Sequence, residues 1–197
     1  MTNREIWMKE NRKNIDNYTD KIVISDSSPL IALNSINKLD FLKLLFKGVY
    51  ATPTVKEECK KGENGFDLPD WIIIKQPNLK IESLIKGRGW DAGEKSAFAL
   101  AIQMDAFNEE NNINEKNCLI LDDHEARKAH KRKSFGVDTV SLRDIFSFAF
   151  DKGLFTRVEG ERLIEEMGVK TRSFKKNDIM VIFNDTITKN KDKNHEY

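Results

Sequence analysis

The sequence has few of the features that mark secreted or membrane-embedded proteins. Its 197 residues include only two cysteines, Cys59 and Cys118, so a disulfide scaffold is excluded and a reduced, intracellular protein is indicated. No apolar run approaches the ~20 residues that a membrane span needs. The first twenty residues lack the apolar segment of a secretion signal. We therefore expect a cytoplasmic protein without membrane association.

The sequence also lacks an excess of charge of either sign. Thirty-three lysines and arginines face 32 aspartates and glutamates, which gives a formal net charge of +1. Net charge therefore gives no indication of a nucleic-acid partner, and only a local basic patch could do so. The length suits one domain. We expect a polar N-terminal arm over 1–20, a single domain over 21–188 and a flexible tail over 189–197.

Short apolar runs alternate with helical segments along the chain. The runs are rich in β-branched residues, as buried strands are, and they cover residues 21–25, 48–53, 71–75, 118–121 and 136–140. Helical spacing is clearest over 91–107 and is interrupted near Asn37 in the segment 30–45. This alternation predicts an α/β fold, a three-layer sandwich around a mainly parallel five-stranded sheet. Right-handed crossovers would place the carboxyl ends of all strands at one edge, where ligands of such sheets bind.

Acidic residues gather where these strands end and the neighbouring helices begin, and they are Asp26, Glu57, Glu58, Asp91, Glu94, Asp122 and Asp123. Two of them stand side by side after the fourth apolar run, in the stretch CLILDDHEAR. Carboxylates that meet in one pocket need a cation, and hard oxygen ligands favour Mg²⁺ or Mn²⁺. Such an ion lowers the pKa of a bound water and orients a phosphodiester.

Each acid also has a purely structural interpretation. Asp26 fits an Asx turn or a helix N-cap, and Asp91 with Glu94 fits a capping box. Acids early in a helix, such as Glu58 and Asp123, complement the helix dipole. For any single acid this interpretation is at least as good as the functional one. Capping alone does not explain a doubled aspartate after one strand together with an acid at the end of another.

Four segments follow one another in the chain: VISDSSPLIALNSINKLDFLKLLF, TPTVKEEC, DAGEKSAFALA and LILDDHEARKAH. Together they resemble the PIN-domain nucleases, in particular a bacterial and archaeal branch related to VapC-type toxins. The likeness extends over about residues 22–185. The sequence departs from the pattern at Val140 and Ser141, where a Gly-Thr pair is common, and in an enlarged loop over 108–117.

The resemblance implies a metal-dependent endoribonuclease. A toxin or a defence effector is one biological role that it suggests for such an enzyme. Asp26, Glu58, Glu94 and Asp123 would be the catalytic ligands of Mg²⁺ or Mn²⁺, and Asp122 would be a further ligand or a support. RNA would be the substrate. The C-terminal helical segments, expected near 156–167 and 173–188, would pack on the sheet or dock an antitoxin-like protein or a second copy of the chain.

Substrate contacts are predicted at Ser28 and in the basic run 127–133. Ser28 would hold Asp26 or a metal-bound water. Arg127 lies one helical turn after Asp123 and would contact the scissile phosphate or neutralise the aspartates. The run also contains Lys128, Lys131 and Arg132, which suit phosphate-backbone binding or simply a solvated helix end.

Two other functions remain open on the sequence alone. A non-catalytic PIN module would keep the fold and bind RNA or a protein partner. A haloacid-dehalogenase-like phosphatase or a receiver would also place an aspartate after a strand. The phosphatases need Asp-x-Asp where this chain has Asp26-Ser27-Ser28, and receivers need the doubled acid after the first strand, so both are less favoured.

Overall fold

The computed structural model describes residues 18–62, 65–85, 90–115, 117–121 and 136–170. The predictions made for most of the N-terminal arm, for a helix after the fourth strand, for a helix near 173–188 and for the tail lie outside these residues. So do Asp122, Asp123, Arg127, Lys128, Lys131 and Arg132.

A five-stranded parallel sheet forms the centre of the molecule, as predicted. Its strands are β1 (Ile22–Ser25), β2 (Gly48–Ala51), β3 (Ile72–Ile74), β4 (Cys118–Ile120) and β5 (Asp138–Val140), in the spatial order β3-β2-β1-β4-β5. The central strand β1 pairs with β2 on one side and β4 on the other. Val23 and Ile24 are completely buried there, because helices cover both faces of the sheet.

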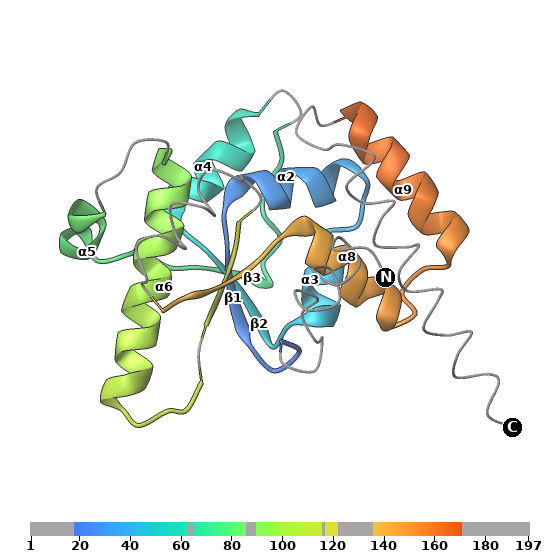
Figure 1. Ribbon diagram of the computed structural model, residues 1–197. Coiled ribbons are helices and arrows are strands. Elements are labelled where there is room, and N and C mark those ends of the chain that lie inside the picture. The colour runs from blue at the N-terminus through green and yellow to red at the C-terminus, as the bar shows by residue number, and fades with distance from the viewer. Residues whose placement is uncertain (1–17, 63–64, 86–89, 116, 122–135, 171–197) are drawn as a thin grey trace, which may run out of the picture.

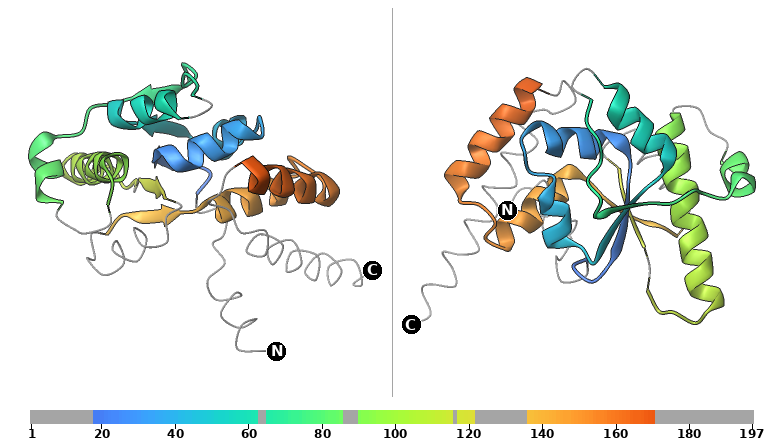
Figure 2. Two further views of the ribbon diagram at one scale, coloured as in Figure 1. Left: turned by 90° about the horizontal axis from the view of Figure 1, so that it is seen from above. Right: turned by 180° about the vertical axis from the view of Figure 1, so that it is seen from behind.

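The described helices are α2 (Ser27–Ser35), α3 (Asp40–Leu45), α4 (Pro53–Lys61), α5 (Leu79–Leu84), α6 (Ala92–Glu110), α8 (Leu142–Asp151) and α9 (Arg157–Lys170). In Figure 1, α6 lies on one side of the sheet and α3 and α8 lie on the other. Figure 2 shows α9 beside α8, on the side away from α6. The three-layer α/β sandwich predicted from the sequence is confirmed.

Local sequence signals explain most helix boundaries. Asn37 has a left-handed φ of 54° and separates α2 from α3, a conformation that asparagine tolerates better than most residues. Pro53 stands in the first turn of α4 after Thr52, whose hydroxyl caps the helix, as proline's missing N–H allows. Ser141 and Asp144 form a capping box at the start of α8. Ser141 thus has a structural role at the position where the sequence departs from the family pattern.

One continuous core joins the layers. Phe41 of α3 stacks on Phe155, and Phe146 of α8 meets both rings, which fastens α8 to α3 below the sheet's carboxyl edge. On the other face, Trp90 packs against Phe98 of α6, with ring centroids 4.9 Å apart. Such aromatic pairs add to the hydrophobic free energy of burial. The start of α6 is therefore fixed by packing as well as by its cap.

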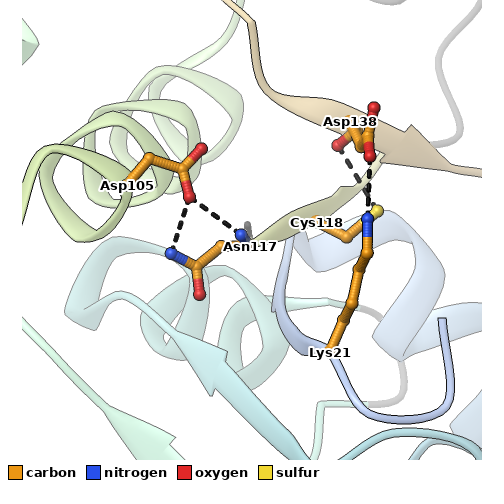
Figure 3. A network of polar contacts seen from close by, with 5 residues as sticks. All are labelled: Lys21, Asp105, Asn117, Cys118 and Asp138. Carbon is orange, nitrogen blue, oxygen red and sulfur yellow. Dashed lines mark hydrogen bonds and ion pairs between the residues drawn. The ribbon is translucent and has the colours of Figure 1, made fainter. Parts of the chain in front are cut away.

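Polar contacts fix the opposite, amino edge of the sheet (Figure 3). Asn117, just before β4, donates its backbone N–H and its side-chain amide to Asp105 Oδ1 of α6, both at 2.8 Å. Lys21, just before β1, forms an ion pair with Asp138 of β5 at 2.8 Å. Cys118 Sγ contacts the Asp138 carbonyl at 3.4 Å. These contacts hold α6, β1, β4 and β5 in register, so that their other ends are positioned together.

Within the part of the chain that the structure describes, no helix has the length and apolar character needed to cross a membrane.

Candidate metal centre

Asp26 is the first acid of the site and lies at the carboxyl end of the central strand. It caps α2, with its Oδ2 accepting the backbone N–H of Ser28 at 3.4 Å. Its own N–H donates to the Ile120 carbonyl at 3.1 Å, which places it beside the end of β4. The residue is only 2% exposed, and its Oδ1 has no hydrogen-bond partner among the described residues. A buried carboxylate oxygen without a partner is costly.

Glu58 comes from α4, the helix that follows β2. The Thr52 hydroxyl accepts the Val55 N–H at the start of this helix, and it also shares a 2.6 Å hydrogen bond with the hydroxyl of Ser96 on α6. Both hydroxyls are buried, and the contact joins α4 to α6. Glu58 is half-buried and Glu57 is exposed, so the two neighbouring glutamates differ in their surroundings.

Asp91 and Glu94 form the capping box at the start of α6. Asp91 Oδ1 accepts the Glu94 N–H at 2.8 Å, and Glu94 Oε2 accepts the Asp91 N–H at 3.1 Å. Glu94 is buried whereas Asp91 is exposed. The reciprocal bonds satisfy two backbone donors of the helix terminus and fix both carboxylates relative to the first turn of α6.

Three carboxylates converge above the ends of β1 and β2. One ligand oxygen each from Asp26, Glu58 and Asp91 lies within 4.8 Å of the other two. The three residues come from three separate segments: the end of β1, the second turn of α4 and the N-cap of α6. Three carboxylates this close repel each other unless some of them are protonated or a cation lies between them.

Burial raises the pKa of Asp26, the charges of Asp91 and Glu58 add to this rise, and the Ser27 and Ser28 N–H groups oppose it, with the net result that the pKa is raised to about 7. The neighbouring Cys59 is buried as well, and burial together with the charges of Asp26 and Glu58 raises the pKa of its thiol to about 12. Both shifts report a buried region of negative potential. A divalent cation placed there would reverse this potential and favour the ionised carboxylate.

The donor set fits a hard divalent cation. All three groups offer carboxylate oxygens, which suit Mg²⁺ and Mn²⁺ and are poor ligands for soft metals. Asp26 Oδ1 has no competing hydrogen bond among the described residues, and the Asp26 side chain is held by its position between β1 and α2. The arrangement can therefore bind a cation without breaking an existing contact of that oxygen.

The structure brings together two of the residues predicted to bind metal, Asp26 and Glu58. Glu94, also predicted, lies one helical turn from Asp91 with an oxygen on the Asp91 backbone, outside the group of three. Asp91 lies next to Asp26 and Glu58 instead; it belongs to the acids gathered at the strand ends but was not among the predicted metal ligands. The predicted contact of Ser28 with Asp26 is made by its backbone N–H. Asp122 and Asp123 follow Leu121 and lie outside the described residues.

The signal that could have identified Asp91 is its place at the N-cap of α6, the helix whose third residue, Glu94, is a predicted metal ligand. A capping box brings both acids to the same helix end, so sequence spacing cannot tell which one faces the other segments.

The chain matches a known protein family. A family model described as a PIN domain matches residues 22–168, more than half of the chain. A search of curated proteins finds no significant match.

Proposed function

Because the chain belongs to the PIN-domain family, whose fold is of the nuclease type, we propose that it is a metal-dependent endoribonuclease that hydrolyses RNA phosphodiesters. The cation would be Mg²⁺ or Mn²⁺. A role as a toxin or defence effector, acting in the cytoplasm under the control of an antitoxin-like protein, is the biological setting we propose for it.

The observation that carries this proposal is the convergence of Asp26, Glu58 and Asp91 around a buried oxygen of Asp26 that has no hydrogen-bond partner among the described residues. Structural capping explains Asp91, and it explains one oxygen of Asp26. It does not explain why Glu58 is directed toward both from a different helix, at a cost in repulsion. A cation-binding function accounts for all three.

The residues of the chain would divide the work. Asp26, Glu58 and Asp91 would hold the cation, while Glu94 keeps Asp91 in place through its backbone N–H and remains a proposed ligand itself. Asp123, with Asp122 in support, would complete the site from the end of β4, whose Ile120 carbonyl already accepts the Asp26 N–H. When bound, a divalent cation supplies a nucleophilic water at neutral pH and stabilises charge on the phosphate.

Substrate binding would use the basic run that follows these aspartates. Arg127, Lys128, Lys131 and Arg132 would contact the RNA backbone, and Ser28 would help to orient Asp26. Contacts of this kind bind phosphate without reading sequence, so affinity for RNA should fall steeply with salt.

The proposal is tested by a matched pair of substitutions on α4. Glu58→Gln should abolish cleavage of a labelled RNA in Mn²⁺, because it removes one charged ligand. Glu57→Gln, one residue away and exposed, should cleave like the wild type. Circular dichroism and thermal melting in EDTA verify that both variants fold. Equal cleavage by the two variants would refute the proposed site.

The same assay separates the proposal from a non-catalytic module. A module that only binds RNA would retain RNA in a gel-shift experiment and leave it intact at every Mn²⁺ concentration. Replacing the RNA by DNA of the same sequence tests the role of the 2′-hydroxyl. The receiver alternative is disfavoured by the strand order β3-β2-β1-β4-β5, since receivers have the order 2-1-3-4-5.

A further inference from the structure

Gly93 stands at a position where a glycine has no backbone reason to be. It is the second residue of α6, and its backbone is helical rather than left-handed, so an alanine could adopt the same conformation. Alanine is the better helix former at such a position, because glycine loses more conformational freedom on folding. Gly93 is buried. An explanation for the glycine must therefore lie in what surrounds it.

The space that a side chain at position 93 would need is occupied by the candidate site. A Cβ built on Gly93 would overlap with Glu58 Oε2, and it would lie 2.9 Å from Glu58 Cδ and 3.0 Å from Asp26 Oδ1. Real Cβ atoms essentially never approach other atoms as closely as these two Glu58 atoms, and 3.0 Å from Asp26 Oδ1 is tighter than most real Cβ contacts. Asp26 Oδ1 is the buried oxygen that lacks a hydrogen-bond partner in the described part of the chain.

The backbone at Gly93 cannot easily withdraw from this contact. Ser96 Oγ donates to the Gly93 carbonyl at 3.0 Å. Since that bond uses the only hydroxyl proton of Ser96, Thr52 must donate to Ser96 in the 2.6 Å contact between them. The Gly93 backbone is thereby linked through two buried hydroxyls to the start of α4, the helix that carries Glu58. Of the groups in contact, the Glu58 carboxylate is the one at the end of a flexible side chain.

We propose that Gly93 is a positioning residue of the metal site, whose missing side chain leaves the space in which the Glu58 and Asp26 carboxylates approach each other. This inference rests on the proposed metal-binding function and adds a residue that carries no ligand atom. A methyl group at position 93 would turn Glu58 away from Asp26. The fold would be kept, while the site would lose one of its three converging oxygens.

The test measures metal binding and stability separately on the full chain. Mn²⁺ affinity is measured by titration with detection of free Mn²⁺ by electron paramagnetic resonance. Gly93→Ala should weaken Mn²⁺ binding by at least about tenfold, the scale found when residues that orient metal ligands are replaced. Its melting temperature in EDTA should equal or exceed that of the wild type. A merely structural glycine would give the opposite result, a lower melting temperature with unchanged Mn²⁺ affinity.

Gly62→Ala is the matched control. Gly62 ends α4, the helix of Glu58, and an added Cβ meets nothing within 4 Å there. Its φ of −58° is open to alanine. This variant should bind Mn²⁺ like the wild type, which separates the effect of a methyl group beside the carboxylates from the effect of any glycine replacement.

A second substitution tests the mechanism directly. Glu58→Asp shortens the side chain that the methyl group would displace. If steric exclusion is the cause, Gly93→Ala should cost much less Mn²⁺ affinity in the Glu58→Asp background than in the wild type, a non-additivity expected only for residues in contact. Equal losses in both backgrounds, or unchanged binding by Gly93→Ala, would overturn the inference while leaving the metal site standing. A wild-type chain that binds no Mn²⁺ would overturn both.

Discussion

Replacing Asp26 by asparagine should stabilise the metal-free protein, and increasingly so as the pH rises. The pKa of Asp26 is 3.8 as an ordinary carboxyl group and about 7 in the folded chain, a difference that corresponds to about 4 kcal/mol. The folded state therefore favours the neutral acid. The contribution of Asp26 to stability is complete below pH 3.8, is lost as the pH rises through about 7, and stays constant above that.

Asparagine cannot ionise, and it caps a helix as well as aspartate does. In EDTA, the free energy of unfolding of Asp26→Asn should exceed that of the wild type, and this advantage should grow by about 3 kcal/mol between pH 5 and pH 8. Urea denaturation at the two pH values measures it. Comparing the same pair of proteins at both values cancels the other titrating groups.

Asp40→Asn provides the control, because Asp40 is an exposed acid in the first turn of α3. Its effect on stability should be small, because the carboxylate is exposed to solvent. An advantage of Asp26→Asn that is equal at pH 5 and pH 8 would refute the argument that a buried, repelled carboxylate occupies this position. With Mn²⁺ added, the difference in free energy of unfolding between Asp26→Asn and the wild type should become smaller or change sign. A ligand that binds the folded wild type stabilises it by mass action.

Two further predictions concern residues next to the site and at the opposite edge of the sheet. The thiols of Cys59 and Cys118 should resist iodoacetamide at pH 8 in the native protein and react once the chain is unfolded. Both residues are at most 1% exposed, and burial, with nearby negative charge, raises the pKa of Cys59 to about 12. Rapid labelling of the folded chain would contradict this prediction. Asn117→Ala should lower the free energy of unfolding by about 1–3 kcal/mol, because it removes a buried hydrogen bond to Asp105. Asn108→Ala, whose amide bonds to the Glu115 carbonyl at an exposed site, should cost less than half as much in the same denaturation experiment.

The fold was predictable because its signals are local. Buried β-branched runs gave all five strands within one or two residues, and the family resemblance is confirmed over residues 22–168. The interruption predicted near Asn37 is the break between α2 and α3 in the structure. Two helices run three residues past their expected ends: α9 continues to Lys170 instead of 167, and α6 continues to Glu110 instead of 107, which takes up part of the loop expected over 108–117. No apolar residue marks that extension, because the last turn is solvated.

The spatial order of the strands could not be predicted in the same way. Alternation of strands and helices indicates a parallel sheet, but it does not say that the chain moves from β1 outward to β3 and then returns to place β4 on the other side of β1. That return brings the end of β4 next to Asp26, through the hydrogen bond from Asp26 N to the Ile120 carbonyl. The meeting of distant acids follows from this topology, and no spacing along the sequence encodes it.

The start of α6 shows why capping and cation binding are not competing explanations of the same acids. The capping box occupies Asp91 Oδ1 and Glu94 Oε2 with backbone donors, and it thereby fixes where the Asp91 carboxylate lies. A carboxylate so fixed loses little conformational freedom when a cation binds, which favours affinity. The cap thus contributes to the site by holding one ligand still, while β1 and the linked hydroxyls of Thr52 and Ser96 hold the elements that carry the other two. The sequence shows the cap. Only the structure shows that the Glu58 and Asp26 carboxylates lie beside the capping residue Asp91, and that Gly93 leaves room for them.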